Sequence, residues 1–79
     1  MATKAYVLIN TTVGKSSSVL RSLRQAKGIR EADGVTGEVD IIAIVEAEDL
    51  NGIGKVVTTK IHTVDGVQRT KTYVRAMDS

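Results

Sequence analysis

The sequence has no cysteine, proline, phenylalanine or tryptophan, and only one histidine and two tyrosines among 79 residues. Without cysteine, the fold has neither disulfides nor thiolate zinc sites. A Ser/His/Asp site would need the lone His62 to meet one of the serines at 16–18, and nothing in the spacing indicates that. We therefore expect no catalytic residues, no metal site and no cofactor, and we interpret His62 as a surface residue at a helix end.

A strong excess of charge and a long apolar run are also missing. The formal net charge is +2, from 11 basic and 9 acidic residues. The densest basic cluster has the spacing of a solvated helix face rather than of a nucleic-acid footprint, and comprises Arg21, Arg24, Lys27 and Arg30. No apolar run approaches the ~18 residues of a membrane span. We expect a cytoplasmic protein that contacts neither membrane nor nucleic acid.

What is present is a globular composition, with 42% hydrophobic and 25% charged residues. The length indicates one domain over residues 1–79. A chain this short buries only about 60–65% of the surface that its unfolded form exposes. Because the chain lacks the disulfides and zinc sites that stabilise many small domains, we expect self-association to bury more surface.

Hydrophobic periodicity predicts strands at 4–12, 29–36, 39–47 and 67–76. Between them it predicts two helices, one capped by the serines at 16–18 and one capped by Asp49. The apolar stripes of these helices are Val19, Leu20, Leu23 and Ala26 in the first, and Leu50, Ile53, Val57 and Ile61 in the second. Gly52 and Gly54 weaken the second helix and allow close packing against the sheet.

The resulting β-α-β-β-α-β order and a faint 38-residue repeat predict an α+β, ferredoxin-like fold. In this fold, two helices cover one face of a four-stranded antiparallel sheet. RNA-recognition motifs share the order, but the aromatic residues that stack bases are missing from the third strand. In the 38-residue repeat, Gly28 corresponds to Gly66, for example.

The strands at 4–12 and 39–47 are apolar on both faces. Tyr6 and Leu8 alternate with Val7 and Ile9, and the run 41–45 is entirely apolar. Because helices cover only one face of such a sheet, the other face needs a partner. We therefore predict a dimer in which two sheets face each other.

The hairpin at 35–40 is the most informative stretch for function. Gly37 supplies turn geometry, and Asp40 places a carboxylate at the start of a strongly apolar strand. From the residues alone, two interpretations of Asp40 are equal: a strand-end residue that bonds the hairpin backbone, or a ligand for an ammonium group. Thr70 and Thr72 share one face of the last strand, as cross-strand filler by default or as ligand contacts.

Three segments together resemble the effector-binding (RAM) domain of the Lrp/AsnC, or feast/famine, transcription regulators. They are A-Y-V-L-I-N-T-T-V-G-K at 5–15, the hairpin V-T-G-E-V-D with a G-x-x-D pattern at Gly37 and Asp40, and D-G-V-Q-R-T-K-T-Y-V at 65–74. The resemblance covers essentially the whole chain. One departure is the loop T-V-D-G at 63–66, where the family often has proline before glycine.

The resemblance implies dimers formed by facing sheets, higher ring oligomers, and free amino acids bound between dimers near the hairpin turn. The residues that match the family's binding positions, or lie beside them, are Val35, Thr36, Gly37, Asp40, Thr70 and Thr72. The first strand begins within a few residues of Met1, so no helix-turn-helix precedes it in this sequence. We therefore expect no direct DNA contact, and modulation of full-length Lrp/AsnC regulators by mixed assembly.

The leading hypothesis is a regulatory domain that binds an amino acid and oligomerises, with Asp40 pairing with the α-ammonium group. One alternative is a structural oligomerisation module that assembles without a ligand. Another is a small dimeric enzyme on a ferredoxin-like scaffold. The sequence does not identify the amino acid, and it does not fix the assembly beyond a dimer.

Overall fold

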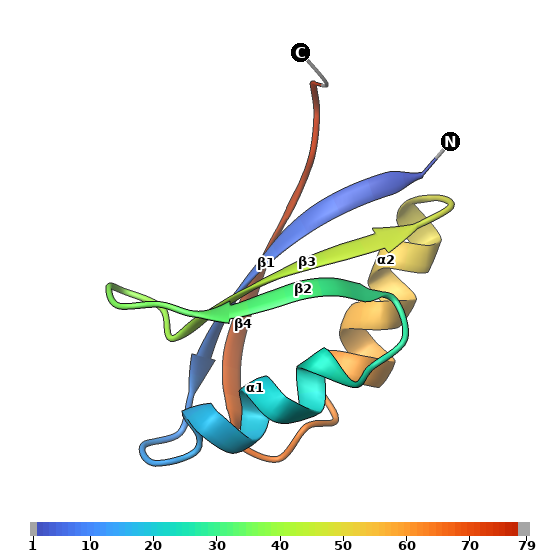
Figure 1. The fold of residues 1–79 in the computed structure, drawn as a ribbon. Coiled ribbons are helices and arrows are strands. Elements are labelled where there is room, and N and C mark those ends of the chain that lie inside the picture. The colour runs from blue at the N-terminus through green and yellow to red at the C-terminus, as the bar shows by residue number, and fades with distance from the viewer. Residues whose placement is uncertain (1, 78–79) are drawn as a thin grey trace.

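The computed structural model describes residues 2–77, which form a four-stranded sheet with two helices on one face (Figure 1). In chain order the elements are β1 (Thr3–Thr11), α1 (Ser16–Arg24), β2 (Ile29–Gly34), β3 (Ile41–Ala47), α2 (Leu50–Val56), the π-helical segment η1 (Val57–Ile61) and β4 (Val67–Val74). This order confirms the predicted ferredoxin-like α+β fold. Within residues 2–77, no helix combines the length and apolarity needed to cross a membrane.

The sheet has the strand order β2-β3-β1-β4, and every neighbouring pair is antiparallel. The two central strands are β1 and β3, the strands whose sequences are apolar on both faces. Val7 of β1 lies opposite Ala43 of β3 on one side and Thr72 of β4 on the other. Because paired residues project from the same face, this register sorts all side chains of the sheet into two sets.

The core lies between the sheet and the helices. Alternate residues of β1 and β3 project into it, and the predicted stripes of both helices close it from above. Its fully buried large side chains are Val7, Ile9, Val19, Leu23, Ile41, Val45, Ile53 and Ile61. Leu50 is a correction to the predicted stripe, because it is 64% exposed. It is the first residue of α2, and side chains there tilt back past the end of the helix.

The two helix starts differ from each other. Asp49 caps α2 as predicted, since its Oδ1 accepts a hydrogen bond of 2.8 Å from the Gly52 N–H. The predicted serine cap of α1 is wrong: Lys15 occupies the cap position and makes no side-chain cap bond. Ser16 instead bonds a β1 residue, Thr11, and so belongs to the site described below.

Glycines allow close contacts at three places. A Cβ on Gly52 would lie 2.7 Å from the Ala47 Cβ, which confirms close packing there, whereas Gly54 has open space around it and the same prediction is wrong for it. Gly28 and Gly66 follow the two helices with φ of 94° and 102°. A Cβ on Gly28 would meet Val56 of α2, and one on Gly66 would meet residues at the start of α1. The 38-residue repeat thus corresponds to two equivalent helix–strand turns.

The face of the sheet that the helices leave uncovered is here called the open face. Its centre is apolar and consists of Tyr6, Leu8, Ile42, Ile44 and Tyr73. The two tyrosines are 37% and 54% exposed, and the three aliphatic side chains are half-buried. This confirms that the two central strands are apolar on both faces, with one face in the core and the other toward solvent.

Candidate functional site

The hairpin between β2 and β3 borders an open hollow of about 630 Å³. The residues lining it are Ser16, Gly34, Val35, Thr36 and Asp40. The hairpin loop is wider than predicted, because β2 ends at Gly34 and β3 begins at Ile41. The predicted strand ends at 35–36 and 39–40 therefore belong to the loop.

Backbone contacts fix the base of this loop. The Val35 N–H donates to the Asp40 carbonyl at 2.9 Å, and the Asp40 N–H donates to the Ile9 carbonyl of β1 at 2.9 Å. At the tip, the Asn10 side-chain amide donates to the Glu38 carbonyl at 2.8 Å. The loop is thus tied to β1 at two points, and Asp40 is held beside the end of that strand.

One oxygen of Asp40 joins a short chain of hydrogen bonds. Its Oδ2 accepts from the Thr11 N–H at 2.8 Å and from the Thr11 hydroxyl at 3.2 Å. The Thr11 and Ser16 hydroxyl oxygens are 2.6 Å apart. Because a hydroxyl has one hydrogen, Thr11 gives its hydrogen to Asp40 and Ser16 donates to Thr11. Thr11, the middle member of this chain, is 8% exposed, whereas Asp40 is half-buried and Ser16 is exposed.

The other oxygen of Asp40, Oδ1, accepts no hydrogen bond from residues 2–77, and no cation of that range forms an ion pair with the carboxylate. Asp40 is only half-buried, so Oδ1 stays accessible. A carboxylate held rigidly by one oxygen, with the second oxygen unengaged, is suited to accept a hydrogen bond from a cationic ligand group.

The loop also offers backbone donors. Within residues 2–77, the N–H groups of Thr36 and Gly37 have no hydrogen-bond partner. Both residues are exposed, and Gly37 has a φ of 145° with nothing within 4 Å of its Cβ position. Unpaired backbone N–H groups in a turn are suited to bind an anionic group such as a carboxylate.

Within one subunit, Thr70 and Thr72 do not join this group. They project from the helix side of β4, opposite Ile9 and Val7, so β1 separates them from the hairpin. The Thr70 hydroxyl lies 2.8 Å from Nε2 of His62, which is exposed, as predicted, and immediately follows η1. This contact borders a separate hollow of about 400 Å³. A ligand role for the two threonines stays a prediction.

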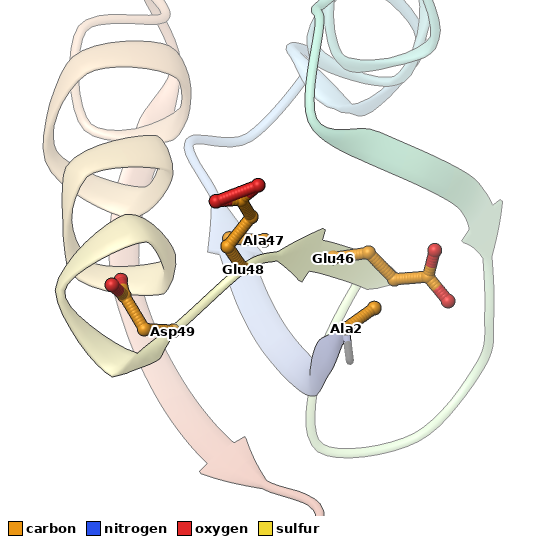
Figure 2. A pocket seen from close by; sticks show the side chains of 5 residues that line it. All are labelled: Ala2, Glu46, Ala47, Glu48 and Asp49. Atoms are coloured by element: carbon orange, nitrogen blue, oxygen red, sulfur yellow. The ribbon is translucent and has the colours of Figure 1, made fainter.

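A further hollow, of about 670 Å³, lies where β3 leads into α2, and acidic residues line most of it. Figure 2 shows that the Glu46 side chain points away from those of Glu48 and Asp49. Asp49 caps the helix, and Glu46 pairs with Arg30 at 2.9 Å. Among residues 2–77, no three side chains of the metal-binding types are grouped closely enough to hold an ion. The hairpin hollow is therefore the stronger candidate for a ligand site.

The predicted site residues Val35, Thr36, Gly37 and Asp40 lie together in the hairpin loop, and their ligand role stays a prediction. The sequence did not indicate that Thr11 and Ser16 join Asp40 through hydrogen bonds. Alternation along β1 places Thr11 on the same face as Val7 and Ile9, toward the helices. No sequence spacing connects Thr11 with Asp40, which lies 29 positions later. For Ser16, the default interpretation as a helix cap concealed its contact with Thr11.

Comparisons with known proteins agree with this fold and extend it. A family model described as "Lrp/AsnC ligand binding domain" matches residues 4–76. A comparison with curated protein sequences finds no match. Among solved structures, TTHA0845 from Thermus thermophilus is 27% identical, with 98% of this chain and 96% of that chain covered and a TM-score of 0.92.

Two further solved structures show the same fold in a short chain and in a longer one. The hypothetical protein PHS023 from Pyrococcus horikoshii is 31% identical, with 99% of this chain and 93% of that chain covered and a TM-score of 0.87. The transcriptional regulator NMB0573 from Neisseria meningitidis, solved as an L-Met complex, is 17% identical with a TM-score of 0.84. In that comparison 96% of this chain but only 51% of the regulator is covered, so the fold forms about half of a longer protein.

Proposed function

The chain belongs to the Lrp/AsnC ligand-binding domain family, and from that premise we propose that it binds a free amino acid beside the β2–β3 hairpin. The observation that carries this proposal is the state of Asp40. Its Oδ2 is anchored by Thr11, and its Oδ1 has no partner within residues 2–77. In the proposed complex, Oδ1 accepts a hydrogen bond from the ligand's α-ammonium group.

The α-carboxylate of the ligand is then bound by the backbone N–H groups of Thr36 and Gly37. A free α-amino acid carries one cationic and one anionic group on the same carbon atom, so a carboxylate beside unpaired N–H donors is complementary to it. The structurally similar Neisseria regulator was solved with L-Met, and this supports an amino acid as the class of ligand. The hollow is open on one side, so a neighbouring subunit is expected to complete its wall.

The proposed regulatory unit is at least a dimer, formed through the open face. Five apolar side chains gather there without cover, a pattern that is uncommon on monomeric proteins. The same fold forms about half of longer regulators, so mixed assembly with such regulators is the proposed route from ligand binding to transcription. A ligand that binds one assembly state more tightly shifts the population toward it.

Asp40→Asn tests the site. Titration calorimetry with each of the twenty amino acids should detect binding to the wild type, and the variant should bind the responding amino acid about tenfold more weakly. The substitution keeps an oxygen that can accept the Thr11 bonds but removes the charge that attracts the ammonium group.

Glu48→Gln is the matched control, because it removes an exposed carboxylate from the other hollow and should leave affinity unchanged. Equal affinity in the wild type and the Asp40 variant would remove Asp40 from the site. If no amino acid binds an intact oligomer, the proposal fails. The role of Asp40 would then be to hold the hairpin to β1 through its bonds from Thr11. The domain would be an assembly module that needs no ligand.

A further inference from the structure

In each half of the chain, a side chain at the end of a helix reaches the edge strand that follows it. Arg24, the last residue of α1, donates from Nε to the Ala32 carbonyl of β2 at 2.9 Å. His62 caps the C-terminal end of η1, and its Nε2 lies 2.8 Å from the Thr70 hydroxyl of β4. Arg24 and His62 are 38 residues apart, and so are Ala32 and Thr70. The two contacts therefore occupy equivalent places in the internal repeat.

The two contacts differ in how they respond to pH. Arginine stays protonated in proteins, so the charge of Arg24 is constant, and Asp33 adds an ion pair with it at 3.7 Å. Histidine is the side chain that ordinarily gains or loses its charge between about pH 5 and pH 8. Of these two helix-to-strand contacts, only the one made by His62 therefore changes its chemistry in the physiological range.

Protonation of His62 fixes the direction of its bond to Thr70. A neutral imidazole has one nitrogen that donates and one that accepts, so Nε2 can accept the hydrogen of the Thr70 hydroxyl. In an imidazolium both nitrogens donate, so Nε2 must give its hydrogen to the Thr70 oxygen. The hydroxyl hydrogen of Thr70 is then free for another acceptor. Protonation thus adds a positive charge and an available hydroxyl donor at the same place.

This pair of residues borders a hollow of about 400 Å³, whose other lining residues are Val67, Gln68 and Arg69. None of the five lining residues is acidic. Within residues 2–77, the side chains of Gln68 and Arg69 make no hydrogen bond and no ion pair. Both carry N–H donors. The hollow therefore offers donors and positive charge, and an anion with several acceptor oxygens complements it.

The charged residues on the elements around His62 leave room for such an anion. The segment η1 contributes Lys60 and β4 contributes Arg69, and both are cations. In the turn between η1 and β4, Asp65 is the single carboxylate, and it pairs with Lys15 at 3.3 Å. A protonated His62 thus stands among cations without a carboxylate of its own, and an incoming anion offsets this excess of positive charge.

We propose that this hollow is an oxyanion site that forms when His62 is protonated, and that His62, Thr70 and Arg69 together bind a small oxyanion such as a sulfate or carboxylate group. At higher pH, neutral His62 takes back the Thr70 hydrogen, and the site loses one charge and one donor. The π-helical segment η1 supports a functional role, because such turns are rare and frequently lie at functional sites. The inference does not rest on the proposed function, since β1 and β3 separate β4 from β2.

The single histidine makes the test direct, because its imidazole signals are unique in the NMR spectrum. The wild-type protein is titrated from about pH 8 to about pH 5 in sodium sulfate and in sodium chloride of equal ionic strength. Sulfate is the probe because its own charge is constant over this range. A proton and an oxyanion that bind together strengthen each other's binding, so sulfate should raise the midpoint of the His62 titration by about 0.5 pH unit. Equal midpoints in the two salts would overturn the proposal.

Substitutions show where the anion lies. Arg69→Gln removes a charged donor and should reduce the sulfate-induced shift by about half, and Thr70→Val should reduce it as well. Arg21→Gln is the matched control, because it removes an equal charge from an exposed residue of α1 and should leave the shift unchanged. A shift in Arg69→Gln as large as in the wild type would place the anion elsewhere and overturn the proposal.

Asp40→Asn separates this site from the proposed amino-acid site. The variant should keep the whole sulfate-induced shift of the His62 midpoint, even though its amino-acid binding is weakened. Loss of the shift in Asp40→Asn would place the anion at the hairpin and refute the oxyanion site beside His62. A full shift in a protein that binds no amino acid would instead refute the proposed function and support this site.

Discussion

At the scale of single residues, the two oxygens of the Asp40 carboxylate have different roles. Its Oδ2 holds the hairpin to the end of β1 through Thr11, and the proposed ligand uses Oδ1. Ser16 extends the same chain of hydrogen bonds to the first residue of α1. Loop, strand and helix therefore meet at one carboxylate, and the hydroxyl groups of Thr11 and Ser16 help to fix its position.

Thr11→Val removes the middle hydroxyl of this chain and keeps the shape of the side chain. We expect the free energy of unfolding to fall by about 1 kcal/mol, because two hydrogen bonds are lost and the Ser16 hydroxyl loses its acceptor. Amino-acid affinity should fall as well, since Asp40 keeps only the backbone bond from Thr11. Urea unfolding and calorimetry measure the two effects. Thr12→Val is the control, because Thr12 is exposed and uses its backbone N–H for Gly66; an equal effect in both variants would contradict the described chain.

The sequence predicts those parts of the site that lie close together along the chain, and it does not predict those that depend on tertiary packing. Gly37 and Asp40 are three residues apart in a turn, so their proximity is a local property that the sequence contains. The contacts of Asp40 with Thr11, and of Thr70 with His62, depend on how strands and helices pack, and no local pattern encodes them. Thr70 and Thr72 share one face, as alternation predicted, but that face lies toward the helices.

At the scale of elements, Gly28 and Gly66 end the two helix–strand turns with positive φ and with almost no space for a Cβ. Gly28→Ala and Gly66→Ala should each lower the free energy of unfolding by about 1–3 kcal/mol, through backbone strain and contact with Val56 or with Lys15 and Val19. Thermal and urea unfolding measure the loss.

Gly54→Ala is the matched control for these two variants. Gly54 lies inside α2, has no positive φ and has nothing within 4 Å of its Cβ position. The substitution should therefore stabilise the domain by about 0.5–1 kcal/mol, because alanine loses less conformational freedom than glycine in a helix. A loss of stability in Gly54→Ala comparable to that in Gly28→Ala would contradict the contacts described for the turns.

Element types and their order were predictable because alternation and helical spacing are strong here, and element ends were less so. Val35 and Val39 favour strands by type, yet both belong to the loop, since Asp40 is tied to β1. Three adjacent serines favoured a side-chain cap on α1, but the Ser16 hydroxyl bonds Thr11 instead. In each case a contact with a residue of another element prevailed over a local preference.

At the scale of the whole molecule, the proposed dimer through the open face would make the stability of the domain depend on protein concentration. Ile44→Lys places a charge in the apolar centre of that face and should convert the dimer to monomer at micromolar concentration, measured by sedimentation. The wild-type melting temperature should rise with protein concentration, as for any folded state stabilised by association, and this dependence should disappear in the variant. Val13→Lys is the control, because Val13 is 98% exposed in the loop before α1 and lies outside the open face. Equal dissociation in both variants would show that the dimer uses another surface.

The strand order β2-β3-β1-β4 interleaves the two halves of the chain. If the chain is cut at the hairpin, the first half contributes β1 and β2 and the second half contributes β3 and β4, yet every pair of neighbouring strands joins one half to the other. Neither half has a pair of neighbouring strands of its own, so we expect the domain to form and unfold in one cooperative step. The hairpin with Asp40 is the only covalent bridge between these interleaved halves. An amino acid bound at the proposed site would therefore stabilise both halves together, and its binding should raise the unfolding temperature of the whole domain.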